Sequence, residues 1–262
     1  MSQLERELGV QLLRRTTRRV EVTEAGELVL ARGRRALAEA DAVTVDLDAL
    51  RGLVRGSLRI GGLPPVGYKQ SAALIGDFTR AHPGVTVTVR DGTTFALLAQ
   101  LRDGALDLVS ALVDPGGRDG LEGVCLFDTE LVVIAAVDHP LARAKHVRVE
   151  RLAGQALITS GAVAALRDTL LALAPGGRVV AEANELAAVC ELAASGLGVT
   201  LLPRSFVAEH GDRLAIRPLR PRRMLPMSLL WRAHERPTPA AQAFREHVLS
   251  AFRAGNLDTH PR

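Results

Sequence analysis

Residues with small or hydroxyl-bearing side chains recur where predicted strands of this chain end and helices begin. Thr93 and Thr94 follow one predicted strand, Thr159 and Ser160 follow another, and Asn184 follows a third. Each of these residues, taken alone, is explained by an ordinary helix cap. Their recurrence at the carboxyl ends of strands is typical of the crevice where α/β proteins bind polar or anionic ligands. With the loop after the first strand, the predicted ligand contacts are Pro64, Pro65, Val66, Thr93, Thr94, Thr159, Ser160 and Asn184.

A basic segment near the N-terminus is the second candidate site. Residues 14–19 read Arg-Arg-Thr-Thr-Arg-Arg, which places four guanidinium groups and two hydroxyls in six positions. Guanidinium groups bind phosphate oxygens, so the segment suits a nucleic-acid backbone. A solvated turn with fortuitous charge is the alternative, and the charge pattern alone leaves both interpretations open.

The sequence lacks the motifs of common enzymes. It contains no Gly-x-Ser-x-Gly nucleophile elbow and no phosphate loop ending in Gly-Lys-Ser/Thr. The glycines of 196–203 follow a predicted helix and lead into a strand, the reverse of a dinucleotide-binding turn. The seven His residues show no paired spacing typical of metal ligands. We therefore predict no catalytic residue, no metal site and no cofactor, and we expect that the protein is not an enzyme.

The two cysteines, Cys125 and Cys190, both stand among apolar residues. Such cysteines are usually small core residues, so neither is predicted to be redox-active. Two cysteines in 262 residues also exclude a disulfide-built secreted scaffold. No apolar run approaches the ~20 residues that cross a bilayer, and the first residues lack the pattern of a signal peptide. These features predict a soluble, cytoplasmic protein.

Beyond Gly56, short periodic apolar runs predict alternating strands and helices. Such alternation is typical of α/β folds with parallel sheets and right-handed crossovers. The predicted strands are Leu58–Ile60, Val85–Val89, Asp107–Leu112, Leu131–Ala136, Leu157–Ile158, Val179–Ala181, Val199–Leu202 and Ser228–Trp231. The predicted helices are Gln70–Ala81, Thr94–Asp103, Ala162–Leu173, Glu185–Ser195 and Pro239–Phe252.

Before Gly56 the pattern is helical and basic. A short helix ends near Gly9, Val20 and Val22 alternate with charged residues as in a short strand, and Thr23 suits the N-cap of a following helix. From Glu24 onward, a long stretch without Pro carries a narrow apolar stripe, which predicts pairing with another helix. Packing on the protein's own body is the alternative. The residues expected at a dimer interface are Leu30, Leu37, Val43, Leu47 and Leu50.

Motifs in a fixed order resemble the LysR-type transcriptional regulators over nearly the whole chain. They are Leu4-Glu5-Arg6-Glu7-Leu8-Gly9, Val22-Thr23-Glu24-Ala25-Gly26, Gly56-Ser57-Leu58-Arg59-Ile60-Gly61, Leu101-Arg102-Asp103-Gly104-Ala105-Leu106-Asp107, Asp138-His139-Pro140-Leu141-Ala142 and the run 194–203. The resemblance implies an α/β effector domain of the type-2 periplasmic-binding-protein kind, two-lobed, preceded by a long linker helix and a partial winged helix-turn-helix. It also implies a homodimer or homotetramer that binds promoter DNA, responds to a small-molecule effector and contacts RNA polymerase.

By this resemblance, residues 1–23 correspond to the end of the recognition helix and the wing, 24–55 to the linker or dimerisation helix, and 56–262 to the effector-binding domain. Lobe I would take about 56–133 and 232–255, and lobe II about 134–231. The family begins with two further helices and most of its recognition helix before the position of Met1, so a chain truncated at its N-terminus is implied. The implied DNA contacts are Ser2, Gln3, Arg14, Arg15, Thr16, Thr17, Arg18 and Arg19.

Pro64 and Pro65 depart from the polar residues that the family often carries in its first cleft loop. They remove two backbone donors, so the ligand is expected to be less anionic, or to be held mainly by the Thr and Ser residues. Two alternatives to a DNA-binding regulator are an effector-binding fragment and a solute-binding sensor without sequence-specific DNA binding.

Overall fold

The computed structural model describes residues 2–15, 20–30, 32–33, 36, 54–62, 68–116, 120–207 and 213–254. Its N-terminal unit contains helix α1 (Ser2–Leu8) and an antiparallel hairpin of β1 (Leu13–Arg15) and β2 (Val20–Val22). Residues 24–30 are helical, and Thr23 caps that helix by accepting a hydrogen bond from the Gly26 N–H at 3.0 Å. The predicted helix, strand and N-cap are thus confirmed.

One eight-stranded mixed sheet runs through the remainder of the described chain. Its order is β4-β3-β5-β12-β6-β11-β7, and β10 pairs with β6 outside that path. Strand β3 is parallel to β4 and β5, whereas β12 is antiparallel to both β5 and β6. The strands are β3 (Arg55–Gly61), β4 (Gly84–Arg90), β5 (Leu108–Leu112), β6 (Leu121–Ala136), β7 (Val147–Arg148), β10 (Thr200–Pro203), β11 (Leu214–Arg220) and β12 (Met224–Arg232).

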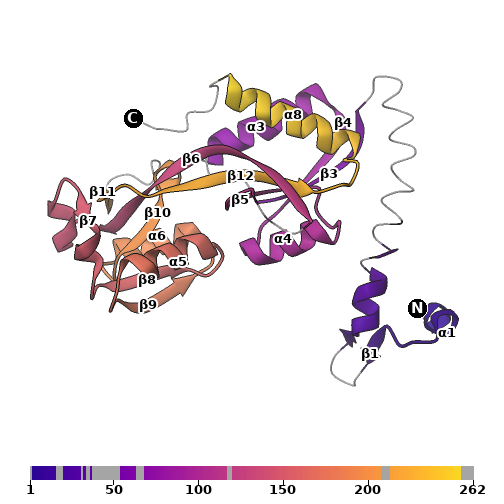
Figure 1. The fold of residues 1–262 in the computed structure, drawn as a ribbon, viewed down its shortest axis with the longest axis horizontal. Helices are drawn as coiled ribbons and strands as arrows, with labels where there is room; N and C mark the ends of the chain where they lie inside the picture. The colour runs from indigo at the N-terminus through magenta and orange to yellow at the C-terminus, as the bar shows by residue number, and fades with distance from the viewer. Residues whose placement is uncertain are drawn as a thin grey trace.

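Three helices cover the part of the sheet that contains β3, β4 and β5, and we call this assembly the first lobe (Figure 1). Helices α3 (Tyr68–Ala81) and α8 (Pro239–Arg253) pack around Phe78 and Phe244, whose rings meet edge to face at 5.0 Å. Helix α4 (Thr94–Arg102) buries its leucines in a separate cluster with Val109 of β5. Because adjacent residues of a strand point to opposite faces, the first lobe has two apolar layers.

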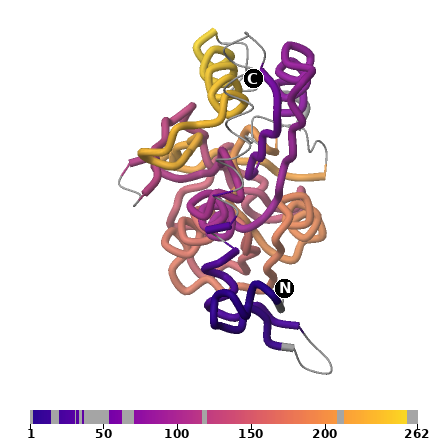
Figure 2. Tube along the Cα trace, turned by 90° about the vertical axis from the view of Figure 1, so that its right-hand side faces the viewer, coloured from indigo at the N-terminus to yellow at the C-terminus, as the bar shows by residue number. Residues whose placement is uncertain are grey.

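The second lobe, as we name it, contains the other end of the sheet and a small parallel sheet of β8 (Ala156–Ser160) and β9 (Arg178–Ala183). Its helices are α5 (Ala164–Leu173), α6 (Leu186–Ala194) and the short α7 (Arg204–Val207), with 3-10 turns at Pro140–Arg143 and Val149–Leu152. Apolar residues of these elements form two buried clusters. Figure 2 shows α3 and α8 at one end of the molecule and the second-lobe segments, salmon to orange, below them.

Strand β6 belongs to both lobes. Its 16 residues pair with β12 over 121–130 and with β10 and β11 over 131–136. In Figure 1 the β6 and β12 strands cross from the first lobe toward the second. This shared strand therefore connects the two cores.

The expected parallel pairing is present for β3 with β4 and β5, for β7 with β11 and for β8 with β9, but the large sheet is mixed. Strands β12, β10 and β11 all pair antiparallel with β6, because the chain returns through the same sheet after building the second lobe. The sequence pattern also missed β11, β7 and the first half of β6, where exposed charged residues interrupt the apolar alternation. The predicted helices and the other strands are present near their expected bounds.

Of the predicted dimer-stripe residues, Leu30 is 43% exposed. The others, Leu37, Val43, Leu47 and Leu50, lie outside the described residues. Within the part of the chain that is described, no helix has the length and apolar character needed to cross a membrane.

Candidate ligand-binding cleft and wing

A backbone hydrogen bond joins the two lobes at the predicted crevice. The Thr94 N–H donates to the Ala162 carbonyl oxygen at 2.9 Å, and the Thr94 hydroxyl makes a longer bond of 3.4 Å to the same oxygen. Thr94 is the first residue of α4, where backbone N–H groups have no partner inside the helix. Ala162 lies between β8 and α5. The beginning of a first-lobe helix therefore contacts a strand-end loop of the second lobe.

Two of the predicted ligand-binding hydroxyls act as helix caps. The Thr93 Oγ1 accepts a hydrogen bond from the Ala96 N–H at 3.1 Å, and the Ser160 Oγ accepts one from the Val163 N–H at 3.2 Å. Each hydroxyl retains one hydrogen to donate. These residues hold the two loops in place, as a plain cap would, and each can still donate one hydrogen bond and accept one more.

A charged pair that the sequence analysis did not single out lies beside these loops. The Arg167 Nε and the Glu182 Oε2 are 3.2 Å apart, and the two side chains are 47% and 49% exposed. The buried Thr159 hydroxyl donates to the same carboxylate oxygen at 3.1 Å. Helix α5 supplies the arginine and the end of β9 supplies the glutamate, so one cation and one anion stand together at the edge of the second lobe.

Gly161 brings Asn184 to the same place. A Cβ at position 161 would lie 2.7 Å from the Asn184 Oδ1 and 3.2 Å from the Glu182 Oε1. The lack of a side chain thus lets both polar groups lie over the loop that precedes Ala162. One signal in the sequence could have identified Glu182: it is the first residue of the Glu-Ala-Asn segment from which Asn184 was predicted as a ligand contact.

The Thr94–Ala162 hydrogen bond brings together loops that carry predicted contacts from both lobes. Thr93 and Thr94 come from the first lobe, and Thr159, Ser160 and Asn184 come from the second. Pro64, Pro65 and Val66 lie outside the described residues, so their part in the crevice stays a prediction.

The two cysteines differ in burial. Cys125 is exposed on β6, so its prediction as a core residue was wrong; only one face of that half of the strand is covered. Cys190 is buried in the second-lobe core, as expected. Burial raises the pKa of Cys190 to about 11. The pKa of Cys125 is also raised, by partial desolvation of its thiol and by the nearby negative charge of Asp128.

A further group of charges lies where β6 passes from one lobe to the other. The Glu130 Oε2 accepts a hydrogen bond from the Arg204 Nε at 2.7 Å. The Glu130 Oε1 is 3.3 Å from the Arg222 Nε, an ion-pair distance without the geometry of a hydrogen bond. Beside this pair, the buried hydroxyls of Thr129 and Ser205 are 3.3 Å apart. These contacts attach α7 and the β11–β12 turn to the shared strand.

In the N-terminal unit, the Glu5 carboxylate accepts from the backbone N–H groups of Leu12 and Leu13, at 2.8 and 3.1 Å, and thereby ties α1 to β1. Gln3 contacts Glu7 on the exposed side of α1, and Arg14 is exposed on β1. The side chains of Ser2 and Arg15 are not described, and Thr16, Thr17, Arg18 and Arg19 lie outside the described residues. The predicted DNA contacts stay predictions.

Two family descriptions match the chain. The LysR substrate binding domain matches residues 51–253, and the bacterial regulatory helix-turn-helix protein of the lysR family matches residues 1–27. The second match favours a DNA-binding regulator over a solute-binding sensor.

Similar proteins and structures agree with this assignment. A probable hydrogen peroxide-inducible genes activator of Streptomyces viridosporus is 34% identical over 81% of this chain and 70% of its own length. An uncharacterized HTH-type transcriptional regulator of Escherichia coli, YnfL, is 29% identical over 95% of this chain and 86% of its own. Full-length OxyR from Pseudomonas aeruginosa superposes with a TM-score of 0.74 and 26% identity, covering 97% of this chain and 83% of that one. The chain belongs to the LysR family of transcriptional regulators.

Proposed function

We propose that this regulator responds to a small polar molecule that binds, without a covalent bond, beside the Thr94–Ala162 contact. That contact carries the proposal, because it is a hydrogen bond between the lobes with the Arg167–Glu182 pair next to it. A ligand shifts the lobe arrangement only if it binds the open and closed forms with different affinity. A molecule that touches both sides of this contact meets that condition.

The charged pair indicates the chemistry of the ligand. A pure anion would meet the negative charge of Glu182, and a pure cation would meet the positive charge of Arg167. A molecule that carries an amine or hydroxyl near a carboxylate pairs with both groups, which remain half exposed. The proposal agrees with the expectation, drawn from Pro64 and Pro65, of a less anionic effector.

Peroxide sensing by a thiol is the second candidate, because relatives are named as hydrogen peroxide-inducible activators. The reactive form of cysteine is the thiolate. The raised pKa of Cys125 and the Cys190 pKa of about 11 keep both thiols protonated at neutral pH. These observations favour a bound effector over oxidation of either cysteine.

Isothermal titration calorimetry with amino acids, hydroxy acids and dicarboxylates tests the ligand chemistry. We expect binding of molecules that carry both a donor and a carboxylate, and Glu182→Gln should weaken the best amine-bearing ligand by about tenfold. The matched control is Glu191→Gln, because Glu191 pairs with Arg213 on an exposed surface of the same lobe. The proposal fails if nothing in the panel binds, or if the two variants bind equally well.

For the DNA-binding part, we propose that Arg14, Arg15, Arg18 and Arg19 contact the phosphate backbone. Arg14→Ala and Arg18→Ala should lower DNA affinity similarly on all sequences and flatten its salt dependence. Arg80→Ala, on the exposed side of α3, removes the same charge from another lobe as a control. An unchanged salt slope in the wing variants would contradict the phosphate role.

The partners are proposed on the same basis. Pairing of the helix that follows Thr23 would give a homodimer or homotetramer, with Leu30 and its stripe at the interface. Contact with RNA polymerase and a cytoplasmic location follow from a role at promoter DNA. The regulator needs no catalytic step for this role.

A further inference from the structure

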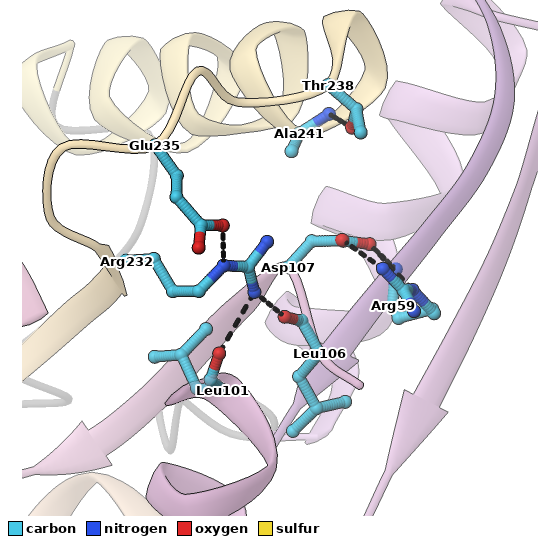
Figure 3. Close-up of polar contacts among 8 residues, drawn as sticks. All are labelled: Arg59, Leu101, Leu106, Asp107, Arg232, Glu235, Thr238 and Ala241. Carbon is cyan, nitrogen blue, oxygen red and sulfur yellow. Dashed lines mark hydrogen bonds and ion pairs between the residues drawn. The ribbon is translucent and has the colours of Figure 1, made fainter. Parts of the chain in front are cut away.

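A hollow on the first lobe lies apart from the crevice between the lobes. It forms where β12 leads into α8 and where β5 begins (Figure 3). The predicted crevice involves the opposite ends of the parallel strands, beyond Gly61 and Leu112. The residues that matter in its lining are Asp107, Trp231, Arg232, Arg236, Thr238 and Arg245.

The floor of the hollow is held rigidly. One Arg232 nitrogen, Nη1, donates to the carbonyl oxygens of Leu101 and Leu106 at 2.9 and 2.6 Å, and the Arg232 Nε bonds to Glu235. The Asp107 carboxylate is held by Arg59, with Nη2 at 2.6 Å from Oδ1. Figure 3 shows these contacts. Both carboxylates at the floor are therefore already paired with arginines.

Arg245 differs from these residues. Its guanidinium lies over the Trp231 ring, 4.7 Å from the ring centre. Among the described residues, no carboxylate lies within ion-pair distance of it. An arginine stacked on an aromatic ring keeps its in-plane N–H groups available for an oxyanion.

The charge of the lining is positive. Three arginines line the hollow against two carboxylates, and one of those, Asp107, is neutralised by Arg59 from behind. The hollow is open to solvent on one side, and its volume of about 20 Å³ has room for one group of the size of a water molecule. The hollow thus fits one oxygen of a ligand, with the rest of the ligand outside.

We propose that this hollow is a second ligand site, which binds the oxyanion end of a small carboxylate or phosphate through Arg245. The site does not depend on the N-terminus of α8, because the Thr238 hydroxyl already caps the Ala241 N–H there. It is independent of the proposed cleft ligand, since no residue is shared between the two sites.

Trp231 provides a local signal, because it is the only Trp of the sequence. Its fluorescence in the full chain would be titrated with inorganic phosphate and, separately, with acetate, at constant ionic strength. We expect a saturable change with a midpoint on the order of 1 mM for at least one of the two probes. The probe that saturates identifies which oxyanion the hollow prefers.

Substitutions on one helix provide the test and its control. Arg245→Gln should raise the midpoint at least about fivefold, and Arg245→Lys should recover part of the loss. Arg253→Gln removes the same charge from the exposed end of α8 and should leave the midpoint unchanged. Arg167→Gln, in the cleft, should also leave it unchanged.

Three results would overturn the proposal. The first is a wild-type signal that does not saturate with either probe, and the second is an equal effect of Arg245→Gln and Arg253→Gln, which would show only general electrostatics. The third is a fluorescence change that disappears in Arg167→Gln but is unaffected in Arg245→Gln, which would show that the probe binds in the cleft and not in the hollow.

Discussion

Each lobe contains an arginine–carboxylate pair, and the two pairs lie in very different surroundings. In the first lobe, Asp107 is 3% exposed and Arg59 is 27% exposed, and the carboxylate also accepts the Arg59 backbone N–H at 2.8 Å. In the second lobe, Arg167 and Glu182 are each about half exposed and share one contact of 3.2 Å. The chemistry of the groups is the same, and their burial is not.

The difference separates a structural pair from a pair available to ligands. A buried carboxylate that loses its partner is left uncompensated in a medium of low dielectric, so its pair is needed for folding. An exposed pair is solvated and screened, contributes little to stability, and can exchange its partner for a ligand. The burial of an arginine–carboxylate pair, more than the identity of its residues, thus predicts whether the pair is structural or available to a ligand.

The largest expected effect is at the buried pair. Asp107→Ala should lower the free energy of unfolding by about 3 kcal/mol, because Arg59 loses its partner and three hydrogen bonds are broken. The midpoint of urea unfolding measures this change. If Asp107→Ala lowers the free energy of unfolding only as much as the loss of a surface ion pair does, the two pairs do not differ in their structural role.

The contact between the lobes should affect their arrangement more than their stability. Thr94→Pro removes the N–H that reaches Ala162, and proline is well tolerated at the first position of a helix. The preceding Thr93 already has the extended backbone, φ −68° and ψ 149°, that proline requires. We expect a shift of about 1 kcal/mol toward open lobes, visible as a larger radius of gyration in solution scattering.

The control for that substitution is Thr94→Ala, which keeps the N–H and removes only the hydroxyl. It should leave the radius of gyration close to that of the wild type. If both variants are equally open, the hydroxyl and not the backbone N–H holds the lobes together.

A smaller effect is expected at the exposed pair. Glu182→Ala should lower the free energy of unfolding by about 1 kcal/mol, because the ion pair with Arg167 is solvated and only the buried Thr159 hydroxyl loses its acceptor. The same urea experiment used for Asp107→Ala gives a direct comparison. A loss above 2 kcal/mol would assign this pair a structural role and weaken the proposed ligand contact.

His139 is partly buried, and its substitution should give the smallest change in stability of this series. Burial lowers its pKa below the usual 6.5, and its Nδ1 accepts the Leu141 N–H at 3.2 Å, which requires the neutral ring. The unfolded chain then binds the proton more readily, so this contribution to stability is present above pH 6.5 and is lost as the pH falls through the lowered pKa. His139→Asn, which can still cap, should reduce the difference in urea midpoint between acidic and neutral pH. A pH difference that is the same in wild type and variant would show that His139 does not titrate with folding.

Local pattern was sufficient for elements with a clear period. The helix predicted over Pro239–Phe252 is present as α8, Pro239–Arg253. The direction of β12 was not predictable, because antiparallel pairing with β5 and β6 depends on where the chain returns after it has built the second lobe. Local pattern carries no information on such long-range placement.

The site was predicted only in part for a similar reason. Thr93 and Ser160 were recognised because a hydroxyl at a helix start has a local signature, and the structure shows them as caps. Arg167 and Glu182 meet only through the packing of α5 against β9, and Trp231 and Arg245 only through the turn between β12 and α8. Pairs of this kind arise from tertiary structure.

The ribbon of β6 and β12 also limits how the lobes can move. Its hydrogen bonds resist stretching along the strands, whereas its two-stranded part over Met224–Pro226 twists readily, and a register shift at the adjoining Met227 and Ser228 increases the local twist. The ribbon is therefore expected to twist more easily than it stretches, and to twist most near the boundary between the lobes. We therefore expect the lobes to move relative to each other mainly by rotation about the strand axis, and only to a small extent by separation.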